Sequence, residues 1–304
     1  SELREFPVRV EAGIITPDYM KEAEKITRPT VGSCAHLGTA NSMCMLTEVL
    51  GMGIPGSGTA PAVSTKRKRI AKASGRAVME LLRKGITPRQ ILTREALLNG
   101  VVGAMATGSS TNLVLHLMAI AHEAGVSLTL EDFDRISREV PFVCNLQPSG
   151  KYPIASLDAS GGIPAVLKTV ESRLNTGVMT CTGKTLGQLL ETYSVQPDDV
   201  IRTMEQPQKP EGGIAVLRGN LAPRGAVVKQ SGVSPSMYQF SGKARVFDSM
   251  EDADAAVSGN TIEKGTVIVI RYEGPKGGPG MREMLSTTAL IMGRGMDHDV
   301  ALVT

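Results

Sequence analysis

The chain has 304 residues, 41% of them hydrophobic and 21% charged, which is the composition of a globular protein long enough for two domains. A net charge of +3 and only 3% aromatic residues argue against a polyanionic partner and against a base-stacking surface for nucleic acid. Four widely spaced cysteines argue against a disulfide framework, and no apolar stretch reaches the length of a membrane span. We therefore expect a cytoplasmic or organelle-matrix protein that binds neither nucleic acid nor a membrane.

The most informative stretch runs from Gly32 to Met43 and places Cys34 just ahead of a predicted helix that ends at Gly51. A cysteine there faces the positive end of the helix dipole and free backbone N–H groups, which favour the thiolate. A thiolate ligates iron or attacks an electrophile. The alternative is a small buried side chain at a helix start. His36, two residues further on, would line the same site.

Helices are also predicted early in the chain, over 18–26 after a polar opening and over 65–84, where Gly85 ends the helix. The buried face of the longer helix is expected to carry Ile70, Ala73, Ala77, Val78, Leu81 and Leu82. Its basic start, 66–69, is typical of a solvated helix face, and we expect a nearby acidic group to compensate it.

Two polar loops are candidates for binding a carboxylate or phosphate. In the first, Gly108 is followed by Ser109, Ser110, Thr111 and Asn112 and then by an apolar helical run. Backbone N–H groups and hydroxyls at a helix start suit an anion, although simple N-capping needs no ligand. The second loop, 147–152, carries Ser149 and Lys151; the lysine either meets an acidic substrate or faces solvent.

The pattern changes along the chain. Helices with a short buried strand over 140–146 indicate an α/β domain, 1–175, and a proline-rich segment, 176–211, reads as a linker. From 212 to 304, short β-branched runs at 214–217, 226–229, 244–247 and 266–271 surround one helix, 249–258, and predict a smaller, β-barrel-like domain. Both ends of the chain look cut, so each domain is expected to be incomplete.

Five stretches in this order resemble the dihydroxy-acid dehydratase family, which includes 6-phosphogluconate dehydratase and the sugar-acid dehydratases. They begin at Gly32, Gly108, Pro148, Gly213 and Gly277, so the likeness spans nearly the whole chain. The last is a glycine-proline loop that carries Arg282 and Glu283.

The resemblance implies a hydro-lyase that removes water from a 2,3-dihydroxy carboxylate, a dihydroxy acid or sugar acid, to give a 2-keto acid. Cys34 would be one of three cysteine ligands of an iron–sulphur cluster, 2Fe-2S in preference to 4Fe-4S, and Glu283 a ligand of Mg²⁺. Soft thiolate suits iron and hard carboxylate suits Mg²⁺. The polar loops at Ser109–Asn112 and Ser149–Lys151 would contact the substrate. The resemblance also implies a homodimer or homotetramer.

The sequence departs from the family at both ends. The other cluster cysteines and a Cys-Asp-Lys stretch are expected upstream, and the catalytic serine base beyond Thr304. Cys44, Cys144 and Cys181 fall outside the family's ligand positions and are predicted to be structural. Two alternatives stay open: a non-catalytic relative or fragment that keeps the fold, and an unrelated α/β enzyme that uses Cys34 as a nucleophile.

Overall fold

A computed structural model describes residues 2–27, 31–274, 282 and 284–304 of the chain. Contacts within the chain divide it into two compact units, one of residues 31–232 and one that joins residues 1–30 to 233–304. The predicted boundaries at 175 and 212 do not coincide with this division. No helix in the described ranges is long and apolar enough to cross a bilayer.

The 31–232 unit is mainly helical. Its regular elements are α3 Thr39–Val49, α4 Thr65–Lys84, α5 Pro88–Ile91, α6 Arg94–Thr107, α7 Asn112–Ala124, α8 Leu130–Glu139, α9 Ile154–Ala159, α10 Gly162–Thr169, η1 Glu171–Arg173, α11 Leu186–Leu190, β1 Ala215–Leu217, β2 Ala226–Val228 and η2 Gln230–Gly232. The two strands pair antiparallel.

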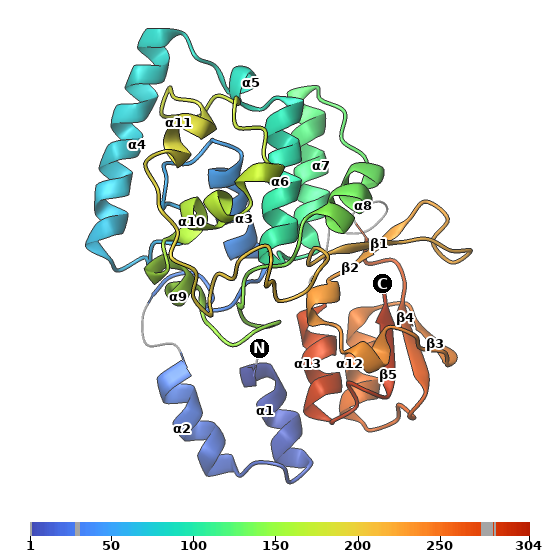
Figure 1. Cartoon of the computed structure of the whole chain (residues 1–304). Helices are drawn as coiled ribbons and strands as arrows, with labels where there is room; N and C mark the ends of the chain where they lie inside the picture. The colour runs from blue at the N-terminus through green and yellow to red at the C-terminus, as the bar shows by residue number, and fades with distance from the viewer. Residues whose placement is uncertain (1, 28–30, 275–281, 283) are drawn as a thin grey trace. The chain divides into compact units, whose positions relative to one another are not determined.

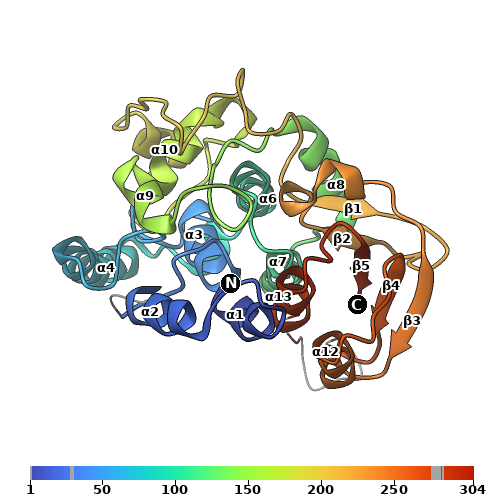
Figure 2. The same cartoon turned by 90° about the horizontal axis from the view of Figure 1, so that it is seen from below.

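Helix α6 is the centre of this unit and packs against α3, α7, α8 and α10 (Figures 1 and 2). It is apolar on all sides and almost entirely buried, as expected for a helix enclosed by others. Gly100 and Gly103 allow α3 to come close, because a Cβ at Gly103 would lie 2.9 Å from a methyl group of Val49. The core of the unit therefore depends on close packing of α3, which follows Cys34, against α6.

Helix α4 has the predicted bounds but not the predicted burial. Ser64 Oγ accepts a hydrogen bond from the Arg67 N–H at its start, and Gly85 ends it in the left-handed conformation. No residue of α4 is buried; Val78 and Leu82 are 58% and 73% exposed. They lie roughly a quarter turn from the half-buried line of Ile70, Ala73, Ala77 and Leu81, so the predicted face was too wide. Figures 1 and 2 show α4 at the edge of its unit.

The segments 140–146 and 176–211 pack together in the same unit. The predicted strand over 140–146 makes only isolated bridges, two of which join it to the 176–211 segment, Phe142 to Lys209 and Cys144 to Ile201. Val178, Leu186, Leu190, Val200 and Ile201 are buried in the core. The proline-rich segment therefore contributes to the packing of the 31–232 unit.

The second unit contains α1 Glu2–Glu11, α2 Pro17–Thr27, η3 Pro235–Met237, β3 Lys243–Phe247, α12 Met250–Ser258, β4 Thr266–Ile270, α13 Leu285–Gly293 and β5 Val300–Val303. The strands form a parallel sheet in the order β3-β4-β5, with α12 between the first two strands and α13 between the last two. Parallel neighbours require such crossovers. Buried side chains of α12, β4 and α13, among them Val257, Ile268 and Ile291, form its core.

The structure confirms a helix-rich α/β protein with small sheets. The strands within the described residues form no closed barrel: β1–β2 is an antiparallel pair and β3–β5 a separate parallel sheet. The expected polar opening contains α1, whose Phe6 and Val8 are buried and which packs against α13. Neither α1, α13 nor β5 was anticipated.

Candidate functional site

Residues 31–38 precede α3 and are here called the Cys34 loop. Hydrogen bonds to its backbone carbonyl groups hold this loop in place. Asn41, in the first turn of α3, is buried, and its Nδ2 donates to the carbonyl oxygens of Cys34, at 2.6 Å, and His36, at 2.8 Å. The Ile154 N–H donates to the Ala35 carbonyl at 2.7 Å. The Cys34 side chain itself is exposed, which excludes the alternative of a small buried residue. The loop thus presents a thiol on a fixed backbone.

The first of the two predicted polar loops, residues 108–112, lies against the start of α3 and is here called the Ser-Thr loop. The Ser110 N–H donates to Ser42 Oγ at 2.9 Å, and Ser110 Oγ lies 3.2 Å from Thr39 Oγ1. Asn112 Nδ2 donates to the same Thr39 hydroxyl at 2.7 Å. Helix α7 begins without a side-chain cap from Thr111. These polar groups therefore link α7 to α3 directly beside the Cys34 loop.

Gly108 shapes the Ser-Thr loop. It ends α6 with φ +66°, a conformation that favours glycine. A Cβ there would lie 2.6 Å from the Phe142 ring and 3.1 Å from Ser231 Oγ. Ser109, next in the chain, is buried and its hydroxyl lies 2.9 Å from Thr107 Oγ1. The loop can follow its path only because residue 108 has no side chain.

The other predicted polar loop, residues 147–152, also lies next to the Cys34 loop. The Leu37 N–H donates to the Gln147 carbonyl at 2.7 Å, which joins this loop to the Cys34 loop. Ser149 Oγ lies 3.2 Å from Ser231 Oγ. The side chain of Lys151 is exposed, while its N–H donates to Asn145 Oδ1 at 3.0 Å. The structure therefore brings together the three loops that the sequence analysis selected.

A lysine that the sequence analysis left without a role connects two of them. Lys229 follows β2, and its Nζ donates to the Gly108 carbonyl at 2.5 Å and to the Leu37 carbonyl at 3.5 Å. Burial lowers the pKa of Lys229 to about 8. Burial also lowers the pKa of His36, and the positive charge of Lys229 lowers it further. The site is therefore partly desolvated and carries a positive charge.

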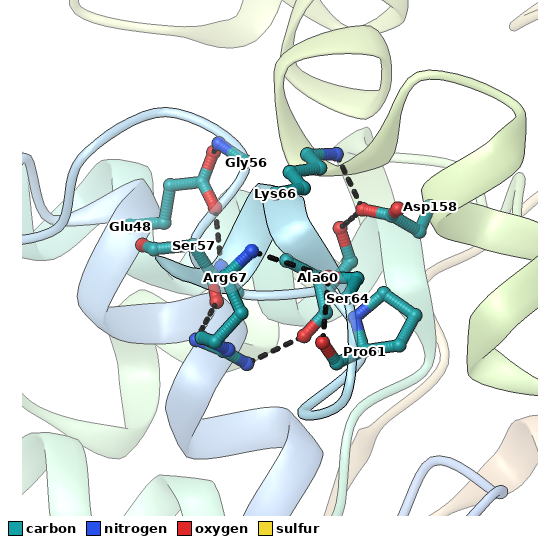
Figure 3. A network of polar contacts seen from close by, with 11 residues as sticks. Glu48, Gly56, Ser57, Ala60, Pro61, Ser64, Lys66, Arg67 and Asp158 are labelled. Carbon is teal, nitrogen blue, oxygen red and sulfur yellow. Dashed lines mark hydrogen bonds and ion pairs between the residues drawn. The ribbon is translucent and has the colours of Figure 1, made fainter. Parts of the chain in front are cut away.

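At the other end of α3, a buried carboxylate organises the glycine-rich loop 51–61 (Figure 3). Glu48 accepts the Gly56 N–H at 2.6 Å and the Gly58 N–H at 2.7 Å, one on each oxygen. Burial raises the pKa of Glu48 to about 7, although these two hydrogen bonds oppose the shift. The sequence showed only an isolated glutamate among apolar residues of the helix.

The basic start of α4 completes this network. Arg67 donates to the carbonyl oxygens of Ser57, at 2.9 Å, and Ala60, at 2.6 Å, and Lys66 forms an ion pair with Asp158 at 2.6 Å (Figure 3). The expected acidic neighbour is thus Asp158 for Lys66. These two basic residues are used to hold the loop and α9 rather than to meet a polyanion.

The chemistry of the cysteines differs from site to site. Burial raises the pKa of Cys144 to about 12 and also raises that of Cys181, so both thiols stay protonated. Cys44 is exposed on α3. Within the described part of the chain, no three histidine, cysteine or acidic side chains come together as a metal site. Cys34 fits a soft metal as a single exposed thiol ligand, and a full ligand set would need other groups.

The glycine-proline loop is described only in part. Glu283, the predicted Mg²⁺ ligand, lies outside the described residues. Arg282 beside it forms ion pairs with Glu251 at 2.7 Å and with the buried Glu273 at 3.0 Å. Arg282 thus fixes one end of that loop to its own unit.

Neither Asn41 nor Lys229 was predicted from the sequence to be a site residue. The only available signal for Lys229 was a charged residue directly after the β-branched run of β2. Asn41 lies within the stretch from Gly32 to Met43, but its donation to two carbonyls depends on the folded loop.

Comparisons with known proteins agree along nearly the whole chain. The N-terminal model of dihydroxy-acid/6-phosphogluconate dehydratases matches residues 2–189, and the C-terminal model matches residues 199–304. A relative from Caldanaerobacter subterraneus subsp. tengcongensis named dihydroxy-acid dehydratase is 53% identical over 297 residues, which cover 97% of this chain and 53% of the relative. Relatives of the same name from Solidesulfovibrio magneticus and Geobacter metallireducens are 53% and 52% identical, with 97% and 99% of this chain and 54% of each relative covered.

The chain thus spans about half the length of the curated relatives that it matches. The matches include all three loops of the site and Lys229. Because both family models match and these relatives share half of their aligned residues with it, the chain belongs to the dihydroxy-acid/6-phosphogluconate dehydratase family.

Proposed function

We propose that the complete protein is a hydro-lyase that removes water from a 2,3-dihydroxy carboxylate, a dihydroxy acid or a sugar acid, and releases a 2-keto acid. The observation that carries this proposal is the exposed Cys34 thiol on a fixed loop, beside two polar loops, in a chain of this family. An unrelated enzyme with a cysteine nucleophile is no longer an alternative. A non-catalytic relative remains one, and the experiment below separates it.

Cys34 would provide one ligand to an iron–sulphur cluster, 2Fe-2S in preference to 4Fe-4S, and Glu283 one ligand to Mg²⁺. When bound, these groups would supply an iron Lewis acid for the departing 3-hydroxyl and a cation for the substrate carboxylate and 2-hydroxyl. The exposed thiol of Cys34 fits the first role because thiolate sulphur is the ligand of such clusters.

The polar loops would hold the substrate. Ser110 and Asn112 are already oriented by Thr39 and Ser42, so their hydroxyl and amide groups would meet a ligand without a large loss of side-chain freedom. Ser109 is buried and would act through the loop backbone. The other proposed substrate contacts are Thr111, Ser149, Lys151 and His36. The ammonium group of Lys151, on its flexible side chain, would pair with the carboxylate of the substrate.

The proposed assembly rests on the resemblance, and the proposed location rests on the composition and cysteine usage of the chain. We propose a homodimer or homotetramer in the cytoplasm, or in an organelle matrix in a eukaryote. Light scattering of the complete protein would measure the assembly directly.

The main test is the visible absorption of the complete protein purified without oxygen. The wild type should be brown and should form a 2-keto acid from a dihydroxy or sugar acid. The Cys34→Ser variant should lose both the absorption and the activity. Cys44→Ser is the matched control, because Cys44 is also exposed and lies only ten residues further along the chain. It should keep both.

Three results would count against the proposal. A colourless wild-type protein would show that no iron–sulphur cluster is bound. Wild-type visible absorption in the Cys34→Ser variant would show that Cys34 is not a cluster ligand. A brown protein that converts no dihydroxy or sugar acid from a broad panel would favour the non-catalytic relative.

A further inference from the structure

Lys229 reaches from the C-terminal family segment into the site that the N-terminal segment builds. It lies in the region matched by the C-terminal model, whereas its two hydrogen-bond acceptors, the carbonyls of Leu37 and Gly108, lie in the region matched by the N-terminal model. All three residues belong to the 31–232 unit. One ammonium group therefore ties the Cys34 loop to the Ser-Thr loop.

The charge of Lys229 has no carboxylate partner in the part of the chain that the structure describes. Its ammonium group donates hydrogen bonds to two carbonyl oxygens, and burial lowers its pKa. Burying a charge is costly unless an opposite charge compensates it, and carbonyl dipoles compensate only in part. A lysine in this state is suited to an anion that binds nearby.

With Lys229, four consecutive carbonyls of the Cys34 loop have donors. The Asn41 side chain donates to the carbonyls of Cys34 and His36. The Ile154 N–H donates to the Ala35 carbonyl, and the Lys229 ammonium donates to the Leu37 carbonyl. Lys229 provides the only one of these donors that carries a charge.

We propose that Lys229 is a positioning residue for the Cys34 loop, and that its positive charge would act on the anionic iron–sulphur cluster that Cys34 would help to hold. The charge part of this inference rests on the proposed function. A nearby positive charge stabilises the more negative, reduced state of such a cluster, since reduction potentials depend on net charge around the metal. Removal of the charge should therefore lower the midpoint potential.

The test uses three variants of the complete protein that separate the hydrogen bonds from the charge. Lys229→Arg keeps both, Lys229→Gln keeps a neutral donor, and Lys229→Met removes both at similar length. Lys72→Met is the matched control, because Lys72 is exposed on α4 and its loss removes the same charge elsewhere. Reductive titration gives the midpoint potential, and circular dichroism in the visible range reports the geometry around the cluster.

We expect lower midpoint potentials in Lys229→Met and Lys229→Gln, an altered visible spectrum in Lys229→Met, and wild-type values in Lys72→Met. Lys229→Arg should stay closer to the wild type than either neutral variant. A folded Lys229→Met protein with the wild-type potential and spectrum would overturn the inference.

A second measurement does not depend on the cluster. In the cluster-free protein, amide hydrogen exchange should be at least several-fold faster at residues 34–38 and 108–112 in Lys229→Met than in the wild type, with helix α8 as internal reference. Unchanged exchange would overturn the positioning role. If the wild type binds no cluster while exchange responds as expected, the proposed function fails and the positioning role stands.

Discussion

The side-chain nitrogen of Asn41 lies 2.6 Å from the carbonyl oxygen of Cys34, and the same nitrogen reaches the His36 carbonyl at 2.8 Å. A buried amide in the first turn of α3 thus fixes the loop that precedes the helix. The contact explains how an exposed cysteine can have a defined backbone.

Asn41→Asp tests this contact. A carboxylate cannot donate to the two carbonyls and would face them as a like charge, so we expect a loss of about 2–3 kcal/mol in the free energy of unfolding. The complete protein should also bind less of its cluster. Denaturant unfolding and visible absorption measure the two effects.

Asn99→Asp is the matched control for that substitution. Asn99 is buried in α6, and its Nδ2 donates to the Asn175 carbonyl at 3.0 Å, remote in sequence from the Cys34 loop. This variant should lose comparable stability and yet keep its cluster. Equal cluster loss in both variants would show that Asn41 acts only through general stability.

Glu48 should make stability depend on pH. Its pKa rises from 4.5 to about 7 on folding, so the folded protein binds this proton more tightly than the unfolded chain does. The contribution is full below pH 4.5 and is lost as the pH rises through about 7. A shift of this size corresponds to roughly 3 kcal/mol at most.

Glu48→Gln removes that titration. The variant should be less stable, because an amide can accept from only one of the Gly56 and Gly58 N–H groups, and its stability should lack the decline between pH 4.5 and 7. Urea unfolding at several pH values measures this. Glu80→Gln, at an exposed position of α4, should keep the wild-type profile; an unchanged decline in Glu48→Gln would assign it to other groups.

Gly108→Ala combines two costs. The residue has φ +66°, and a Cβ would lie 2.6 Å from the Phe142 ring, so we expect a loss of about 2–4 kcal/mol from strain and overpacking. Gly85→Ala has nearly the same φ, +65°, with no atom within 4 Å of its Cβ, and should lose only about 1 kcal/mol. Thermal unfolding compares them, and equal losses would refute the close contact at Gly108.

Glu283→Gln addresses the proposed Mg²⁺ site in the complete protein. Replacing the carboxylate by a neutral amide should weaken Mg²⁺ binding at least tenfold and lower turnover, because Mg²⁺ prefers charged oxygen ligands. The visible spectrum of the cluster should not change. Activity measured against Mg²⁺ concentration tests this, with the exposed Glu263→Gln as control. Wild-type activity of Glu283→Gln at limiting Mg²⁺ would show that Glu283 is not a Mg²⁺ ligand.

The sequence predicted what local chemistry determines. The bounds of α4 follow from Ser64 and Gly85, which act through adjacent backbone groups, and the structure has both. The polar loops were found because serine, threonine and glycine precede an apolar helical run. The α/β class followed from the change in pattern along the chain.

Features that depend on distant contacts were missed or wrong. Closely spaced strands suggested a barrel, whereas α12 and α13 make β3, β4 and β5 parallel. Helix α1 contains a proline and has few apolar residues, and its buried Phe6 and Val8 depend on the packing of α1 against α2 and α13. The link from Lys229 to Leu37 spans 192 residues, so no local pattern could reveal it.

The position of Lys229 also bears on how this family can be recombined. The two family models meet between residues 189 and 199, yet the compact unit continues to Gly232 and buries Ile201 and Ile214 in its core. A chimaera of two relatives joined near residue 194 would combine a lysine from one parent with carbonyls from the other. A crossover after Gly232 keeps those partners native, and its soluble yield should be the higher of the two.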